Sequence, residues 1–394
     1  FKIYVVALIL RLIPVIAARS LGIGLDDMFQ YDMLARSLAQ GHGFRWYAES
    51  DLNQLASFVD FDLSTAREYD PSLGVATSFR APLYPAFLAI VYFFNGIDFS
   101  RFFAARLAQA IFLGAPLAPL TYLVAQRLFT FNFPAPIKIE SGKLIERTAR
   151  LSAWVIAAYP LLLVYPLGLG TENPFFVLLL ASFPFLLSSI ERPSTSHFLL
   201  SGVFLALTAL TRSVILAFAL AAFCLLFYLR GKRAIASILA FVLVVAPWTI
   251  RNSLLHGELT GIETSMGYNL YLGYHPEGNG SFFFGPSLDL LPILDDAERD
   301  KIGTEKAIEF IKAQPERFVP LAINRLGFFF GLEKRVLMYF YGNDLLGFIP
   351  LPLLLTISAI LLLPFVIISI SAALGLSLLR WNPQTCLLAL LLIC

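Results

Sequence analysis

Long apolar runs recur along the chain and limit what it can fold into. A helix needs about 20 apolar residues, each rising about 1.5 Å, to cross a hydrocarbon core of about 30 Å. With 58% hydrophobic and only 14% charged residues, the chain is too apolar for one soluble core of 394 residues. We therefore expect an all-α polytopic membrane protein with about nine or more transmembrane helices. The candidate spans are residues 1–18, 103–127, 150–169, 174–190, 198–211, 214–229, 234–250, 347–378 and a truncated last one from residue 386.

Two polar stretches separate these runs. The expected parts are a first transmembrane helix at 1–18, an external loop with juxtamembrane helices at 19–102, a transmembrane helix bundle at 103–250, an external loop or small subdomain at 251–346, and incomplete C-terminal transmembrane helices at 347–394. Residues 83–95 are apolar but reach only about 20 Å, which favours an interfacial or re-entrant helix. In the second polar stretch, acidic residues from Asp295 and a stop at Pro315 predict one clear helix.

Basic residues in the short turns set the expected orientation. If residues 83–95 are not a span, the basic residues of several short loops fall on the same side of the membrane. These residues lie at 127–150, 192, 230–233 and 380. Cytoplasmic loops of membrane proteins are enriched in Lys and Arg, so this side is expected to be cytoplasmic. Both polar stretches, and the turns at 171–173 and 211–213, are then expected on the external face.

Several classes of function are disfavoured by what the sequence lacks. The net charge is only +2, and no basic run interleaved with aromatic residues suggests a nucleic-acid partner. The sequence has neither a GxxxxGK[ST] motif nor a GxGxxG motif between a strand and a helix, so nucleotide hydrolysis and dinucleotide binding are not indicated. His256 and His275 have no metal-ligand spacing, which favours surface polar positions.

Acidic residues at two places on the expected external face are candidates for catalysis. Asp26 and Asp27 stand at the start of a predicted helix, where either side chain is also suited to cap the first turn. Glu172 lies between two apolar runs, where a carboxylate must face water, a cation or a partner. Such acids can act as general base toward a hydroxyl, orient a substrate or hold a divalent cation.

Arginines also gather on this expected face, against the usual inward bias of basic residues. The candidates for binding an anionic ligand such as phosphate are Arg80, Arg106, Arg212 and Arg251. The alternative is snorkelling of their side chains toward lipid headgroups. Tyr84, in the same short motif as Arg80, and Asn269, in an aromatic and amide-rich stretch, are further candidates for substrate binding because such groups suit polyhydroxyl ligands.

The order of these features resembles the membrane-embedded GT-C glycosyltransferases, in the branch of protein O-mannosyltransferases and lipid A aminoarabinose transferases. The resemblance covers nearly the whole chain. It rests on Asp-Asp after the first span, Arg-Ala-Pro-Leu-Tyr-Pro from Arg80, Ala-Arg-Leu-x-Gln at 105–109, Thr171-Glu172, Leu-Thr-Arg-Ser at 210–213 and Pro-Trp-Thr-Ile-Arg-Asn at 247–252. It implies a GT-C-like helix bundle with its site on the periplasmic face of a bacterial inner membrane.

The resemblance also implies inverting transfer of a sugar from a polyprenyl-phosphate carrier to an acceptor hydroxyl. The family's first acidic residue falls on Asp27 or its neighbour Asp26, its second on Glu172, and its basic residue on Arg80. Ala81 stands where the family has a proline, so the local turn departs from the family pattern.

Beyond the lipid-linked donor, the implied partners are membrane lipids and a glycolipid, polysaccharide or protein acceptor. A divalent cation at Asp27 or Glu172 is the cofactor to consider. The competing hypothesis is a multi-pass transporter of a lipid-linked or anionic substrate, since intramembrane charges also mark transport pathways.

Overall fold

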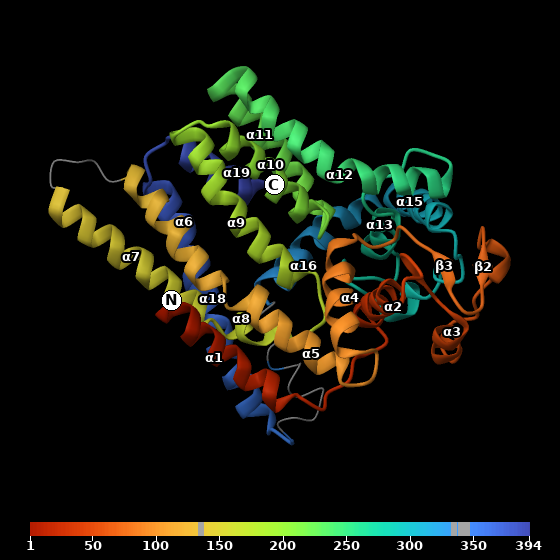
Figure 1. The fold of residues 1–394 in the computed structure, drawn as a ribbon. Coiled ribbons are helices and arrows are strands. Elements are labelled where there is room, and N and C mark those ends of the chain that lie inside the picture. The colour runs from red at the N-terminus through yellow and green to blue at the C-terminus, as the bar shows by residue number, and fades with distance from the viewer. Residues whose placement is uncertain (133–137, 332–336, 338–346) are drawn as a thin grey trace. The chain divides into compact units, whose positions relative to one another are not determined.

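Helices form most of the computed structural model, which describes residues 1–132, 138–331, 337 and 347–394 (Figure 1). The chain divides into two compact units, each built from separated segments. The first unit comprises Phe1–Ile23, Asn95–Pro247 and Val366–Cys394, and the second comprises Gly24–Phe94 and Trp248–Phe365. Each candidate acidic residue therefore belongs to one unit: Asp26 and Asp27 to the second, and Glu172 to the first.

Helices of the first unit follow the apolar runs of the sequence. They are α1 (Lys2–Ala17), α5 (Arg101–Ala108), the π-helical turn η2 (Gln109–Gly114), α6 (Leu117–Asn132), α7 (Lys138–Ala158), α8 (Pro160–Val164), η3 (Tyr165–Leu167), α9 (Glu172–Glu191), α10 (Thr195–Ala209), η4 (Ser213–Ile215), α11 (Leu216–Arg230), η5 (Gly231–Ala234) and α19 (Pro383–Ile393). Helix α12 (Ile235–His256) and helix α18 (Leu351–Leu378) each contribute residues to both units.

Small side chains let the helices of the first unit pack closely, as is usual between membrane helices. Ala7 of α1, Ala115 and Ala118 around the start of α6, and Ala157 of α7 form one buried cluster. Arg11 of α1 is wholly buried beside it and donates to the carbonyl oxygens of residues 7, 156 and 157, so its charge does not face lipid.

A second close approach joins α10 to α12. The backbone of Ser237 lies so near Gly202 that an added Cβ would come within 2.1 Å of its carbonyl oxygen. The hydroxyls of Ser201 and Ser237 hydrogen-bond at 2.9 Å at the same place. Glycine and serine therefore fix this helix contact by allowing the two backbones to approach.

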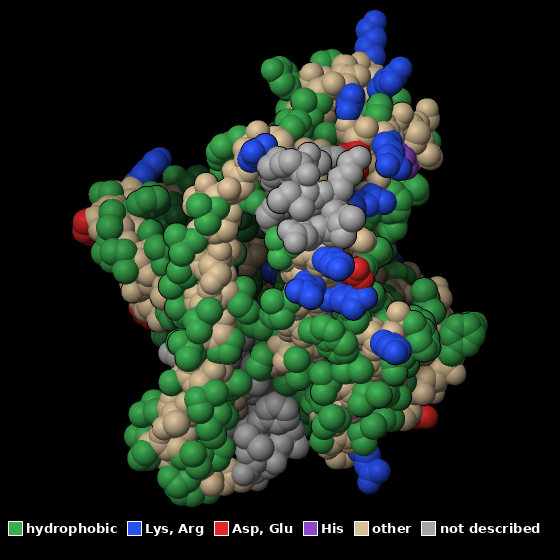
Figure 2. Space-filling model, turned by 90° about the vertical axis from the view of Figure 1, so that its left-hand side faces the viewer, with side chains coloured by type: hydrophobic (Ala, Val, Ile, Leu, Met, Phe, Trp, Pro, Cys, Tyr) green, Lys and Arg blue, Asp and Glu red, His purple; other side chains and the backbone are tan. Residues whose placement is uncertain are grey.

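Four helical stretches within the described residues are long and apolar enough to cross a membrane, and a bent pair makes a fifth. They are Arg101–Thr130, Glu172–Glu191, Ser213–His256 and Leu351–Leu378, with Gly142–Ala158 and Pro160–Leu167 joined at a 52° bend. Proline has no N–H and clashes with the preceding turn, which explains the break at Pro160. Hydrophobic side chains cover most of the face drawn in Figure 2. The chain is therefore a membrane protein with several apolar helices.

The expected count of about nine or more spans is not confirmed. Helices α1, α10 and α19 have only 16, 15 and 11 residues, fewer than a crossing needs. The 44-residue stretch Ser213–His256 turns at Gly231, whose φ is +58°. Phe223 and Phe241, on either side of the turn, meet at 5.4 Å, so α11 and α12 pack as a hairpin.

The second unit combines helices with a small sheet that the all-α expectation did not include. Its elements are α2 (Asp27–Ala39), β1 (Arg45–Trp46), α3 (Glu49–Leu55), η1 (Leu63–Thr65), β2 (Tyr69–Asp70), β3 (Gly74–Ala76), α4 (Leu83–Asn95), α13 (Met266–Tyr274), α14 (Phe284–Ser287), α15 (Asp296–Ala313), η6 (Pro315–Arg317) and α16 (Phe318–Phe330). The strands pair antiparallel in the order β1-β3-β2, with Trp46 and Tyr69 both opposite Val75. The helix predicted from Asp295 is confirmed as α15.

Two glycine contacts hold the core of the second unit. Gly74 has a φ of +74°, and an added Cβ would come within 2.0 Å of the carbonyl oxygen of Trp46. Gly303 of α15 lies against the backbone of Gly267 in α13, where an added Cβ would come within 2.6 Å of the carbonyl oxygen. These contacts seat β3 on β1 and α13 on α15.

Candidate functional site

Asp26 and Asp27 have different roles in the structure. Asp26 is the N-cap of α2, and its Oδ1 accepts a hydrogen bond of 2.9 Å from the backbone N–H of Met28. Asp26 thus caps the first turn of α2. Asp26 is exposed at its surface, but neighbouring groups partly desolvate its carboxyl group. This desolvation and the adjacent Asp27 carboxylate raise the pKa of Asp26. Asp27 is the first helical residue, and its side chain is 69% exposed.

Arg80 holds the carboxylate of Asp27 from one side. Its Nη2 donates to Asp27 Oδ1, while its Nε donates to Gln30 Oε1 at 2.9 Å. The guanidinium also lies over the rings of Tyr31 and Phe79, at 5.2 and 5.1 Å from their centroids. The arginine is therefore fixed by ring contacts and an amide, and it presents an oriented carboxylate to solvent.

Tyr84 supports this pair from within the core. It is wholly buried, and its ring meets that of Tyr31 edge-on at 5.1 Å. Farther along α4, Tyr92 donates to Asp32 Oδ1 at 2.9 Å, so two tyrosines fix α4 against α2. The structure thus places Tyr84 in the scaffold beneath Asp27 and Arg80.

Arg251 lies behind the loop that carries Arg80. One terminal nitrogen donates to the carbonyl oxygen of Thr77, and the other donates to the carbonyl oxygen of Phe44 at 3.3 Å. Its guanidinium stacks over Trp248 at 4.9 Å. Arg251 therefore positions the backbone of the loop close to Arg80, and its expected contact with phosphate stays a prediction.

Asn269 lies on the exposed side of α13. Its Nδ2 donates to the carbonyl oxygen of Ser265 at 2.8 Å, one turn earlier. That bond leaves the Oδ1 of Asn269 on the surface. The described contacts do not bring Asn269 together with Asp27 or Arg80.

The first unit contains a second pairing of an acid with an arginine. Glu172 occupies the first turn of α9, and its Oε1 accepts from Arg212 Nη1 at 2.7 Å. The side chains are 32% and 42% exposed, respectively. A carboxylate at a helix start is favoured by the helix dipole, while the arginine keeps further donors open.

Two polar residues that sequence reasoning did not single out fix the start of α9. Asn173 Nδ2 donates to Gln109 Oε1 at 3.2 Å, and Gln109 Nε2 donates to the carbonyl oxygen of Pro166 at 2.9 Å. Both side chains are buried. Their signal was present in the sequence, since Gln109 ends the motif at 105–109 and Asn173 directly follows Thr171-Glu172.

Arg106 lies in the interior of the first unit. It is wholly buried, and its donors go to backbone carbonyl oxygens: Nε to Leu167 at 2.8 Å, Nη2 to Gly22 at 2.7 Å and Nη1 to Leu21. A guanidinium used in this way ties the end of the first segment to η3. Arg106 therefore stabilises the fold of the first unit, and its expected contact with phosphate stays a prediction.

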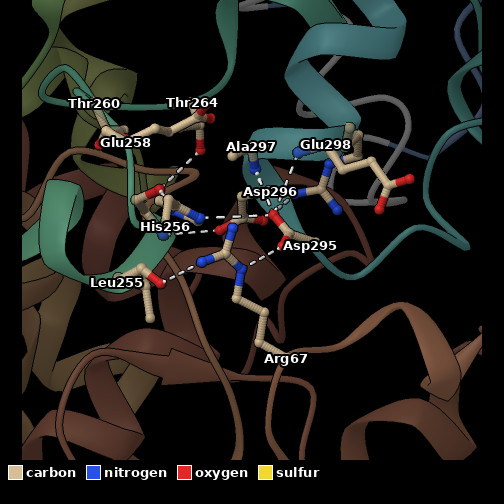
Figure 3. A network of polar contacts seen from close by, with 12 residues as sticks. Arg67, Leu255, His256, Glu258, Thr260, Thr264, Asp295, Asp296, Ala297 and Glu298 are labelled. Carbon is tan, nitrogen blue, oxygen red and sulfur yellow. Dashed lines mark hydrogen bonds and ion pairs between the residues drawn. The ribbon is translucent and has the colours of Figure 1, made fainter.

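A buried polar cluster in the second unit was also missed (Figure 3). His256, expected on the surface, is 6% exposed, and its Nε2 lies 2.6 Å from Ser78 Oγ. Its Nδ1 lies 3.6 Å from Asp295 Oδ1, and Arg67 Nε donates to Asp295 Oδ2 at 2.7 Å. The nearby ring of His256 and the hydrogen bond from Arg67 hold the pKa of Asp295 well below its usual range.

Ser78, His256 and Asp295 lie in the order of the nucleophile, base and acid of a catalytic triad. Ser78 is wholly buried, and its Oγ also contacts Thr264 Oγ1 at 3.0 Å. The backbone N–H groups that would stabilise an oxyanion are occupied, because Ser78 N donates to Asp296 and Phe79 N donates to Thr77 Oγ1. The cluster is thus a clasp between the 77–80 loop and α15.

Among residues 1–132, 138–331, 337 and 347–394, no group of three or more His, Cys, Asp or Glu side chains is placed to hold a metal ion. Asp27 and Glu172 are each paired with an arginine instead. The chain matches no known family, no curated protein and no solved structure.

Proposed function

We propose that the chain is an inverting glycosyltransferase of the GT-C type, which moves a sugar from a polyprenyl-phosphate carrier to an acceptor hydroxyl. The observation that carries this proposal is the exposed carboxylate of Asp27, oriented by the largely buried Arg80. A carboxylate fixed in this way is suited to receive a proton from a hydroxyl that attacks a sugar carbon.

In the proposed step the acceptor oxygen attacks the anomeric carbon opposite the phosphate. Its proton goes to Asp27, the new C–O bond forms, and the pair of electrons of the broken C–O bond leaves with the polyprenyl phosphate. Positive charge near the departing phosphate lowers the barrier, because negative charge grows there in the transition state. Within the first unit, Arg212 is suited to bind a phosphate group, since it is fixed by Glu172 and remains 42% exposed.

A lipid-linked donor is supported by an apolar cavity in the first unit. The cavity measures about 330 Å³ and is lined by Leu117, Thr121, Ile156, Leu162, Phe176, Leu179, Leu180, Phe183 and Leu391. Phe176 lies one turn along α9 from Glu172. A hydrocarbon chain held there would bring its polar head close to Glu172 and Arg212.

The test compares two neighbouring carboxylates. Purified protein is incubated with radiolabelled polyprenyl-phosphate sugars and membrane extract, and release of free polyprenyl phosphate is measured. Asp27→Asn is expected to abolish release. Asp26→Asn is the matched control, because asparagine is as good an N-cap as aspartate and should leave release close to normal.

Two results would contradict the proposal. Equal release by wild type and Asp27→Asn, with Asp26→Asn inactive, would move the base to Asp26. An absence of release with every donor, together with substrate uptake into proteoliposomes, would instead support the transporter hypothesis.

A further inference from the structure

Helix α16 presents an apolar stripe that is largely exposed. Val319, Ile323, Leu326 and Phe330 recur at intervals of four, three and four residues, so they lie on one helix face. Their side chains are 62, 62, 59 and 43% exposed. The sequence analysis places these residues in the external polar stretch. A contiguous apolar stripe exposed to water is unusual there.

The C-terminal turn of α16 packs on the middle of α18. Phe329 and Phe330 meet the ring of Phe365 at 5.6 and 6.0 Å. Helix α18 has 28 residues and, at about 1.5 Å each, is about 42 Å long. That exceeds a hydrocarbon core of about 30 Å by about 12 Å, so a crossing of the membrane by α18 would place Phe365, near its centre, within about 6 Å of the midplane.

The polar groups of α16 and of the turn before it are directed away from the stripe. Arg325 donates to the carbonyl oxygen of Gly273 at 2.8 Å and stacks over Tyr274 at 4.7 Å. Arg317, at the start of the helix, donates to the carbonyl oxygen of Gly278 at 2.7 Å. Both guanidinium groups are therefore satisfied by α13 and the loop that follows it, and the opposite face of α16 is left free of charge.

We propose that α16 is inserted into the bilayer and that lipid acyl chains cover its exposed stripe, with Phe330 the most deeply placed. The 13-residue helix is about 20 Å long, enough to reach from the interface to the depth of Phe365. Lys312 and Glu316, just before it, remain at the aqueous side. This conclusion is independent of the enzymatic proposal.

Spin-label accessibility tests the immersion directly. The cysteines Cys224, Cys386 and Cys394 are replaced by serine, and single nitroxides are attached at Lys312→Cys, Ile323→Cys and Phe330→Cys in the full chain in lipid nanodiscs. Oxygen partitions into the bilayer, whereas a polar nickel chelate stays in water. The label at position 330 is expected to show the highest ratio of oxygen to nickel accessibility, position 323 a lower ratio and position 312 the lowest.

Two outcomes would overturn the proposal. Nickel accessibility at position 330 as high as at position 312 would place α16 in water. Protection of position 330 from both reagents, with close label-to-label distances between copies, would show that a second chain covers the stripe. Ile323→Cys provides a second site where Phe330→Cys disturbs folding, which is checked by size-exclusion chromatography and circular dichroism.

Discussion

Arg251 donates a hydrogen bond to the carbonyl oxygen of Thr77, three residues before Arg80. The loop that presents Arg80 to Asp27 is thereby attached to α12. A hydrogen bond from a charged group contributes about 1.5–3 kcal/mol, so Arg251→Ala is expected to lower the free energy of unfolding by about that amount. Because the loop loosens, transfer activity should fall as well. Thermal unfolding in detergent and donor turnover measure the two effects.

Arg233→Ala is the control for Arg251, since Arg233 is an exposed basic residue in the turn η5. We expect its unfolding midpoint and turnover to stay near wild type. A stable Arg251→Ala protein that fails only to bind a phosphate-containing donor would show that Arg251 contacts substrate, contrary to the positioning function described here.

Arg106 is expected to be essential for folding. Its replacement by methionine leaves the carbonyl oxygens of Leu167, Leu21 and Gly22 without their donors. Losing one partner of a buried charged network costs about 3–5 kcal/mol, so we expect low yield and a much reduced unfolding temperature. Arg101→Met, one turn or so earlier on α5, removes a more exposed arginine and should have a small effect. Normal stability of Arg106→Met would contradict this assignment.

The pair of Glu172 and Arg212 is expected to matter for activity more than for stability. Because both side chains are about a third exposed or more, Glu172→Gln should change the free energy of unfolding by less than about 1 kcal/mol. If the pair orients a phosphate-linked substrate, donor turnover should fall at least tenfold. Glu146→Gln breaks an exposed pair with Arg150 on α7 and should alter neither quantity. Equal turnover of both variants would remove Glu172 from the proposed site.

The clasp around His256 predicts a loss of stability in acid. The pKa of Asp295 is lowered in the folded state, so its ionised form stabilises the fold at pH values above its ordinary pKa of about 4. That contribution is fully present at pH 7 and is lost progressively as the pH falls from about 4 toward the lower pKa of the folded state. Asp295→Asn keeps the helix cap but removes the charge, so its stability should differ from wild type at pH 7 and approach it in acid. Unfolding midpoints measured from pH 7 to pH 3 test this; a difference independent of pH would argue against the linkage.

The helical architecture could be predicted because apolar runs and stop signals are local properties of the chain. The predicted spans at 174–190 and 214–229 correspond to α9 and α11, and the helix from Asp295 corresponds to α15. The small sheet was not predicted, since its strands have only two or three residues and depend on the approach of Gly74 to Trp46.

The separate uses of the charged residues depend on partners far away in sequence. Arg106 and Arg80 are both arginines on the expected external face. Yet one of the carbonyl oxygens that accept from Arg106 belongs to Leu167, which lies 61 residues later in the sequence. His256 is buried because Ser78, 178 residues away, reaches its ring. Asp26 and Asp27 differ only in which of them has the extended backbone of an N-cap. A pattern of residue types shows which side chains carry charge, but it does not show what they meet.

The π-helical turn η2 sets the rotation of α6. In this turn Ala115 N donates to the carbonyl oxygen of Ala110, five residues earlier, where a regular α-helix would use the fourth. The extra residue advances everything that follows by about 100° around the helix axis. Without it Ala118 would point away from Ala7, and a bulkier side chain would meet α1 instead. The alanine contact of the first unit is thus a product of one inserted residue as much as of the alanines themselves.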